Sequence, residues 1–444
     1  MSVESDASRL FGLEGLAVAR VVADGVDGRV VHVVTADETA AGCPSCGVIS
    51  VSVKARVLSR PRDLPYGPVG LSVVWHKRRW RCVEAACARL SFTESLPAVP
   101  ARSRLTTRLR VELGSAVADS GRTVAEVAGH HRVGWPTAHR AFIDYVTPAL
   151  AAPLPPVSVL GIDETRRGKP VFAQDPDTGR WTVVADRWHT GFVDAEGSGG
   201  LLAQVEGRSA TAVTGWLAAQ PAAWRQSITH VAIDLSASYA SAVRAGLPHA
   251  VIVADRFHLV RLAGDTVTAV RQRVIREAEG RRGRKVDPAW RLRRRLLTAH
   301  ERLSSDSFAR MWNTLIDIGA PGEEILSAWV VKEDLRALLA LAGTCPDREQ
   351  ISRRLEVFYA HAAASTAPEV HRLAATIETW WPAILAGLHT GYSNARSEGY
   401  NRLAKHVGRD AFGFRNPTNQ RRRIRWSCTR QHRRAAAVMI TLPA

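Results

Sequence analysis

The sequence contains little cysteine and no long hydrophobic run, and these absences narrow the class of protein. Six cysteines in 444 residues are too few for a disulfide scaffold, which argues against a small secreted domain. No run of about 18 apolar residues occurs, so no membrane span is expected. The opening MSVESDASRL lacks the basic-then-apolar order of a signal peptide. Together these absences predict a protein of a reducing cytoplasm without a membrane span.

Acidic residues are scarce as well. The chain has 42 acidic against 60 basic residues, a net charge of +18, and no acid follows Asp410. Arginine supplies 54 of the basic residues, and its planar fork suits bidentate contacts with phosphate or guanine. A GC-rich genome would also favour arginine codons, and we expect both causes to contribute. The charge balance therefore predicts a polyanionic partner, with nucleic acid as the default.

The length of the chain and its changes of periodicity predict several domains. A single core rarely organises 444 residues, so two to four domains are expected. The stretch AAPLPPV (151–157) marks a boundary after helical periodicity over 103–148. From 157 the runs VSVLGID, PVFAQD, WTVVAD and GFVDAE resemble a three-stranded meander, and ITHVAID and AVIVAD then alternate with helices. Residues 263–388 become basic and helical.

Four of the cysteines form two close pairs. CPSCG and CVEAAC give C-x2-C, 35 intervening residues, and C-x4-C. Two such turns can complete a tetrahedral Zn²⁺ site, so a zinc ribbon is predicted. His76 is a minor alternative ligand, and four free thiols in a β-rich domain are the alternative without a metal. Cys345 and Cys428 are isolated and are expected to be ordinary residues. In the intervening WHKRRWRC, Arg79 and Arg81 are candidate DNA contacts. The predicted zinc ligands are Cys43, Cys46, Cys82 and Cys87.

The segment TVAEVAGHHRVGWPTAHRAF (123–142) is typical of a helix-turn-helix. A first helix would lead through the turn at Val133–Gly134 to a second helix starting at Trp135–Pro136, where proline is tolerated. A helical hairpin that only packs against its neighbours would look similar. Near the groove-facing end of the second helix lie three candidate DNA contacts: Thr137, His139 and Arg140.

Three predicted strands each end in an aspartate: VLGID at Asp163, HVAID at Asp234 and VIVAD at Asp255. If the strands VLGID and HVAID lie side by side in the sheet, Asp163 and Asp234 meet. The repulsion between their carboxylates then favours a divalent cation between them. Hard oxygen ligands suit Mg²⁺ or Mn²⁺. A single aspartate of this kind would more simply be a solvated turn or a helix cap. Downstream, SEGYNRLAK places Glu398, Asn401 and Lys405 on one helical face.

The first of these strands runs on into a basic cluster, SVLGIDETRRGK. Asp163 would face the metal, while Arg166, Arg167 and Lys169 would face the phosphates that the metal activates. Glu164 is either a supporting acid or simply exposed. Asp255 and His258 lie together in ADRFH, and Asp255 could rival Asp234 as a ligand.

The motifs CPSCG…RRWRC, GIDE, IDLSASY, ADRFHLV and SEGYNRLAKHVGRDAFGFRN follow one another in this order. The chain thereby resembles, from about residue 40 to 425, the DDE transposases of the bacterial ISL3 insertion-sequence family. The resemblance implies a multidomain α+β protein with an N-terminal zinc ribbon, a helix-turn-helix and a ribonuclease H-like α/β catalytic core with a helical insertion. It also implies an acidic triad of Asp163, Asp234 and Glu398. The expected domains are a zinc ribbon over 1–100, a helix-turn-helix over 101–150, a first part of the core over 157–262, the insertion over 263–388, and a closing helix with a basic tail over 389–434.

The function implied is cut-and-paste transposition. The N-terminal domains would bind terminal inverted repeats in double-stranded DNA, and the metal-bound triad would cleave each end and join it to target DNA. Arg402 and Lys405 would contact phosphate, and Asn401 would orient Glu398. The insertion carries ten basic residues over 273–297 and would extend the DNA track. A homodimer or larger synaptic assembly is expected. The alternatives are a ribonuclease H-like nuclease without strand transfer and a domesticated, non-catalytic DNA-binding regulator.

Overall fold

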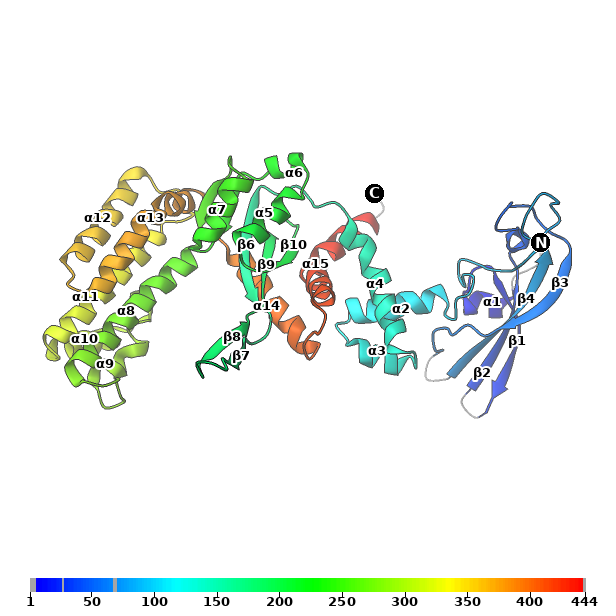
Figure 1. Cartoon of the computed structure of the whole chain (residues 1–444), viewed down its shortest axis with the longest axis horizontal. Coiled ribbons are helices and arrows are strands. Elements are labelled where there is room, and N and C mark those ends of the chain that lie inside the picture. Colours follow the sequence, from blue (N-terminus) through cyan, green and yellow to red (C-terminus); the bar gives the residue numbers. More distant parts are fainter. Residues whose placement is uncertain (1–4, 26–27, 67–69, 442–444) are drawn as a thin grey trace. The chain divides into compact units, whose positions relative to one another are not determined.

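The computed structural model describes residues 5–25, 28–66 and 70–441, without the side chains of Gly70 and of 430–441. The first four residues of the lead-in therefore lie outside the described part. The chain forms two compact units, Met1–Ala152 and Pro153–Ala444, shown together in Figure 1. Among the described helices, none is both long and apolar enough to cross a membrane.

The first unit begins with a five-stranded sheet of order β1-β2-β4-β3, with β5 paired to β4. β2 and β4 run parallel, and the other neighbours run antiparallel. Val33 and Trp75 are fully buried where this sheet meets Val99. The elements are α1 (Asp6–Phe11), β1 (Leu16–Asp24), β2 (Gly28–Thr35), η1 (Glu38–Ala41), β3 (Val53–Ser59), β4 (Gly70–Arg81) and β5 (Ser91–Thr93).

Three helices follow in the same unit: α2 (Thr107–Ala118), α3 (Val124–His130) and α4 (Trp135–Ala151). Thr123 and Glu126 form a capping box that starts α3, and α4 starts at Trp135 with proline in its first turn. Asp63 accepts hydrogen bonds from Thr106 Oγ1 at 2.7 Å and Arg108 Nε at 2.8 Å. These bonds attach the start of α2 to the loop before β4.

The second unit is built on a mixed sheet of order β10-β9-β6-β11-β12. β10, β9 and β6 pair antiparallel, and β6, β11 and β12 pair parallel, the arrangement of a ribonuclease H-like core. Leu160, Ile162 and Val231 are fully buried because helices cover the sheet. The elements are β6 (Val159–Arg166), β9 (Trp188–Asp194), β10 (Leu201–Glu206), α5 (Ala210–Ala218), α6 (Ala222–Gln226), β11 (His230–Ile233), α7 (Ala237–Gly246) and β12 (Val251–Ala254).

The composition of the antiparallel part differs from the expected meander. PVFAQD and WTVVAD do not join the main sheet but form a separate two-stranded hairpin of β7 (Val171–Gln174) and β8 (Trp181–Ala185). The third strand of the meander is instead β10. Alternation of apolar residues is the same in a core strand and in an exposed hairpin, so sequence periodicity did not separate them.

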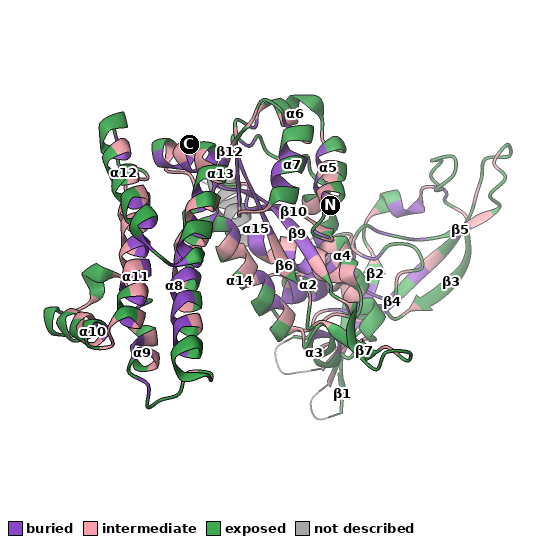
Figure 2. Cartoon of the chain, turned by 60° about the vertical axis from the view of Figure 1, so that its left-hand side comes forward, coloured by how far each residue is buried: buried purple, intermediate pink, exposed green. Residues whose placement is uncertain are grey.

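A helical insertion separates β12 from the last two helices. Figure 2 shows buried stripes along α8 and α11 where these helices face each other. Trp329 is buried in this core. Arg273 of α8 forms ion pairs with Glu324 of α11 and Glu369 of α13 and so links the three helices. The helices are α8 (Arg256–Glu279), α9 (Pro288–Arg291), α10 (Ser305–Asp317), α11 (Ala320–Leu339), α12 (Arg348–Ala364) and α13 (Pro368–Thr390), with short 3₁₀ turns at Leu292–Arg294 and His300–Arg302.

After the insertion the chain returns to the sheet as α14 (Ala395–Asp410) and α15 (Pro417–Thr441) (Figure 1). α14 crosses β6 closely at Gly161, where an added Cβ would lie 2.6 Å from Ser397 Oγ and 2.8 Å from Asn394 Oδ1. Val407 and Ile424 pack with Val193 of β9 on this side. A residue larger than glycine at 161 would push α14 away from the strand.

Candidate active site and cysteine cluster

The parallel pairing of β6 with β11 brings two of the expected acids together. In the register of β6 and β11, Ile162 lies opposite Ile233, so Asp163 and Asp234 follow at the same edge of the sheet. The prediction that these strands are neighbours is confirmed. Asp163 is buried and Asp234 is partly buried. The expectation that the strand VLGID ends at Asp163 is wrong, because β6 continues to Arg166 beside β9. The parallel pairing with β11 stops at Ile162, and the two carboxylates share a partly dry environment where that pairing ends.

The protonation of both carboxyls reflects this environment. Burial, followed by the charge of Asp234, raises the pKa of Asp163 to about 7. Burial raises the pKa of Asp234 to about 6, although His258 beside it opposes the shift. Among the described residues, Asp234 Oδ1 is buried and no group lies in hydrogen-bonding position to it. The Asp234 Oδ1 oxygen and the neighbouring carboxylate of Asp163 are oxygen donors of the kind that a hard divalent cation binds.

Helix α14 places polar side chains along β6. Asn401 Nδ2 donates to Asp163 Oδ2 at 2.6 Å, and Asn394 Nδ2 donates to the carbonyl of Ile162 at 3.0 Å. Glu398 is partly buried and comes four residues after Asn394 and three before Asn401. Helical geometry therefore puts Glu398 on the face that is turned toward β6.

Asp255 and His258 also lie close to Asp234, and His258 contacts both aspartates. His258 Nε2 lies 3.0 Å from Asp234 Oδ2, and His258 Nδ1 lies 3.1 Å from Asp255 Oδ2. The hydrogen bond with Asp255 raises the pKa of His258. Asp255 Oδ1 also accepts from the backbone N–H of Asn394 at 3.3 Å, so the buried Asp255 touches the start of α14.

Within the described residues, two sets of three or more potential ligand atoms lie within 4.8 Å of one another: the cysteine cluster, and Asp234 with Asp255 and His258. Asp163 and Glu398 belong to neither set. Of the three acids expected to act together, only Asp234 lies in such a set, and its partners there are Asp255 and His258. Asp163 follows β6 residue Ile162 beside the end of β11, and Glu398 lies on α14.

The basic residues after β6 are engaged to different degrees. Arg166 pairs with Asp186 at 3.2 Å and covers the Trp188 ring. Arg167 donates to Gln420 Oε1 at 2.7 Å and to the carbonyl of Phe414 at 3.0 Å, which ties β6 to the start of α15. Lys169 is exposed, as are Arg402 and Lys405 on α14. Glu164 lies 3.9 Å from Arg208.

In the first unit, the candidate DNA contacts lie on two surfaces. Thr137 and Arg140 are exposed in the first turns of α4, and His139 stacks on Trp135 with ring centroids 4.7 Å apart. Arg79 and Arg81 are exposed on β4, and Arg79 donates to Ser91 Oγ at 3.1 Å.

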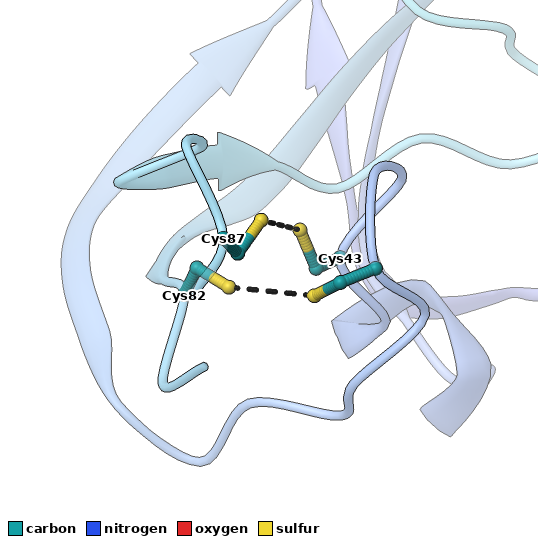
Figure 3. A group of neighbouring side chains, drawn as sticks. Cys43, Cys82 and Cys87 are labelled. Atoms are coloured by element: carbon teal, nitrogen blue, oxygen red, sulfur yellow. Dashed lines mark hydrogen bonds between the residues drawn. The ribbon is translucent and has the colours of Figure 1, made fainter. Parts of the chain in front are cut away.

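The four cysteines from the two pairs converge (Figure 3). Cys43 Sγ lies 4.0 Å from Cys87 Sγ, and Cys46 Sγ lies 3.6 Å from Cys82 Sγ. A tetrahedron with zinc–sulfur bonds of about 2.3 Å has sulfur–sulfur edges of about 3.8 Å, so the cluster fits this geometry. His76 is not one of the residues in the cluster. Its Nε2 lies instead 2.9 Å from His32 Nδ1. Cys345 is exposed and Cys428 is buried, each apart from the cluster.

Asn394 was not expected at the site. It is fully buried and contacts both β6 and Asp255. The available signal was its position four residues before Glu398, on the same helical face as Asn401. Without the crossing of α14 over Gly161, that spacing alone gave no reason to choose it.

The acidic sheet edge, the cysteine cluster and the helix pair with an exposed polar turn together define a DNA transposase of the DDE class. Sequence models agree for each part. A model described as "Transposase", of the ISL3 DDE type, matches residues 160–424, the helix-turn-helix domain of transposase family ISL3 matches 94–146, and the zinc-finger of transposase IS204/IS1001/IS1096/IS1165 matches 39–87. The chain belongs to the ISL3 transposase family.

Two named transposases are similar to this chain, one over most of its length and one over less than half. The transposase for insertion sequence element IS1001 of Bordetella parapertussis is 25% identical over 387 residues, covering 84% of this chain and 85% of the relative. The transposase for IS1557 of Mycobacterium tuberculosis (strain H37Rv) is 29% identical over 206 residues, covering 43% and 45%. A solved Drosophila P element transposase strand transfer complex covers 72% of this chain and 95% of its own at 8% identity, with a TM-score of 0.34.

Proposed function

We propose that this chain cleaves DNA at the ends of an insertion sequence and joins the freed ends to target DNA, with Asp163, Asp234 and Glu398 holding Mg²⁺ or Mn²⁺. The observation that carries the proposal is the pair of acids where the parallel pairing of β6 with β11 ends, together with the buried Asp234 Oδ1, which has no hydrogen-bond partner among the described residues. When bound, paired cations would activate the attacking oxygen and stabilise the leaving oxygen of a phosphodiester.

The residues of the chain itself have positioning roles in this proposal. Asn401 holds Asp163 Oδ2 through a 2.6 Å bond and so directs the other oxygen of that carboxylate. His258 occupies Asp234 Oδ2 and leaves Oδ1 free for the cation. Asn394 fixes the start of α14 to β6 and to Asp255, which sets where Glu398 emerges. Asp255 supports His258 and the helix start, and we assign it this supporting role.

Substitution of the acids tests this assignment. Asp163→Asn, Asp234→Asn and Glu398→Gln should each reduce cleavage of a duplex carrying the terminal repeat by at least about a thousandfold, because a missing ligand removes transition-state charge stabilisation. Binding of the same duplex should be unchanged. Asp255→Asn is the matched comparison, and it should retain measurable cleavage. If Asp255→Asn is inactive while Asp234→Asn cleaves normally, the proposed triad is wrong.

DNA recognition would come from the first unit. Thr137 and Arg140 lie at the start of α4, the helix that a helix-turn-helix places in the major groove, and Arg79 and Arg81 add basic groups on β4. We assign Zn²⁺ to the four cysteines, which would fix the loops on either side of β3 and β4. Terminal inverted repeats are the expected target of this unit, in the bacterial cytoplasm.

The helical insertion would extend contact along the DNA backbone. Of its ten basic residues over 273–297, Arg273 and Arg281 are paired with acids. Others face solvent at least in part: Arg282, Arg284, Lys285, Arg291 and Arg294. Solvent-facing cations on one segment are suited to phosphates that are not read in sequence.

A further inference from the structure

Helix α14 ends in a backbone conformation that favours glycine but carries phenylalanine there. The N–H of Phe412 donates to the carbonyl of Arg409 and the N–H of Gly413 to that of Gly408, each at 2.9 Å, which is the pattern of a Schellman turn. Phe412 has a φ of 51°, and it is the only aromatic residue with positive φ in the described part of the chain. Three other helices of the chain, α1, α8 and α13, end on glycine with positive φ: Gly12, Gly280 and Gly391. A bulky residue is disfavoured in this conformation, whereas glycine adopts it freely.

The turn holds the backbone of this phenylalanine in place while the ring projects into solvent. Phe412 is 94% exposed, whereas Phe414 packs against the apolar cluster around Val407. Arg167, just after β6, fixes the turn by donating to the carbonyls of Phe414 at 3.0 Å and Arg415 at 3.1 Å. Packing among the described residues therefore does not explain why a strained position keeps an aromatic side chain. Strain of this kind is characteristic of sites that bind a ligand.

Phe412 and the candidate active site lie at opposite ends of α14 (Figure 1). The start of the helix is fixed to β6 by Asn394, and the turn at its end is fixed by Arg167. Phe412 comes 14 residues after Glu398, a length of about 20 Å at about 1.5 Å for each residue. Neighbouring phosphates of one DNA strand are about 3.4 Å apart, so this length matches about six nucleotides.

The surface around the turn remains basic once its acids are counted. Residues 399–425 contain eight basic residues and one acid, Asp410, whose Oδ2 lies 2.8 Å from His406 Nδ1. Acids at the neighbouring strand ends pair with arginine at 3.1, 3.2 and 3.9 Å: Glu206 with Arg421, Asp186 with Arg166, and Glu164 with Arg208. Three exposed cations lie on α14 and in the turn: Arg402, Lys405 and Arg415. An aromatic ring beside exposed cations is the combination that binds single-stranded nucleic acid, because the ring stacks on a base while the cations contact phosphates.

We propose that Phe412 stacks on an unpaired base of a DNA strand held along α14, with Arg402 and Lys405 on the phosphates of that strand. In an intact duplex both faces of each base are covered by neighbouring bases, whereas single-stranded nucleotides next to a staggered cut have free faces. The ring offers such a base the stacking partner that it has lost. The proposal rests on the proposed function, which puts the cut beside Glu398, and it adds that the base about six nucleotides from the cut is bound.

Binding of the full chain to two labelled DNA probes, measured by fluorescence anisotropy, tests the proposal. The first probe is a duplex carrying the terminal repeat with a single-stranded overhang of about eight nucleotides, slightly longer than α14 can follow. The second probe has an overhang of abasic nucleotides, which keeps the phosphates. Phe412→Gly should bind the first probe about tenfold more weakly, because a stacked base is lost, and the second with unchanged affinity. Phe412→Asn should do the same, and Phe412→Tyr should bind like the wild type.

Thermal unfolding separates a loss of binding from a loss of folding. Phe412→Gly and Phe412→Asn should unfold at or above the wild-type temperature, because glycine and asparagine tolerate a positive φ. Val357→Ala, which shortens an exposed apolar side chain on α12, is the control and should leave both affinities unchanged.

Three results would overturn the proposal. Equal weakening of both probes would mean that the ring contacts no base, and unchanged binding of the first probe by Phe412→Gly would mean that the ring stays in solvent. A lower unfolding temperature for both variants would mean that the ring packs within the chain. Neither probe has to be cut, so a chain that binds them as expected but cleaves no DNA would contradict the proposed function and not the stacking.

Discussion

The cysteine cluster and the acidic sheet edge are both suited to metal ions, but they are assembled in different ways. In the cluster, two short loops each supply two sulfur atoms, at 3.6 and 4.0 Å from their partners across the site. In the proposed triad, Asp163 and Asp234 come from two strand segments and Glu398 from a helix late in the chain, with 142 residues between Asp255 and Glu398. Local spacing builds the first site, whereas the second depends on the whole fold of its unit.

This comparison predicts that loss of a cysteine affects folding and that loss of an acid affects chemistry. Cys46→Ser should release the metal and unfold the ribbon, because a structural zinc contributes about 10 kcal/mol or more of apparent binding free energy to a small domain. Elemental analysis and thermal unfolding of the full chain measure the effect. Cys345→Ser is the control, since Cys345 is exposed and apart from the cluster. A variant of Cys46 that keeps its metal and its stability would remove the distinction.

A smaller effect is expected where a side chain only positions an acid. Asn401→Ala removes the 2.6 Å bond to Asp163, and we expect cleavage to fall about 10- to 100-fold with a similar decrease in cation affinity. The stability of the chain should change little. The check is cleavage as a function of Mn²⁺ concentration, with Arg409→Ala, an exposed residue in the last turn of α14, as the control. Unchanged dependence on Mn²⁺ would mean that Asn401 serves packing alone.

Proton competition separates the two sites further. Because the pKa values of Asp163 and Asp234 are raised to about 7 and about 6, Mn²⁺ must displace protons, and its apparent affinity should rise about tenfold or more as the pH increases from about 6 to about 8. The stability of the cation-free chain should change with pH in the opposite direction to the Mn²⁺ affinity. Both carboxyls bind protons more tightly in the folded than in the unfolded state, so the free energy of unfolding should fall as the pH rises through these pKa values. Calorimetric titration of Mn²⁺ at several pH values checks the first trend. A flat profile would contradict the shared acidic environment.

The smallest effect concerns the helical insertion. Removing the charges of Arg282, Arg284 and Lys285, which face solvent at least in part, should lower affinity for duplex DNA. The slope of log K against log salt should also become shallower by about 0.9 for each phosphate that these side chains no longer neutralise. Glu349→Gln with Arg353→Gln, which removes an exposed ion pair on α12, is the neutral control. An unchanged slope would show that this segment is only solvated.

The sequence predicted those parts whose chemistry is local. The cysteine pairs and the helix start at Trp135–Pro136 follow from local spacing, and Asp234 and Asp255 do follow the last residue of their strands. The strand that carries Asp163 continues to Arg166, so that boundary was predicted wrongly. The hairpin was misplaced because its alternation equals that of a core strand. Asn394 and the link from His258 to both Asp234 and Asp255 were beyond local reasoning, since they exist only once α14 crosses β6 at Gly161 and α8 begins beside β11.

The late position of α14 has a consequence for synthesis of the protein. A ribosome completes both parts of the first unit that are proposed to contact DNA, the sheet of the second unit and the helical insertion before it reaches Glu398 and Asn401. If the acids act as proposed, a nascent or prematurely terminated chain could occupy transposon ends without being able to cut them. Such a fragment would block the intact enzyme, so translation itself would delay and limit damage to the host chromosome.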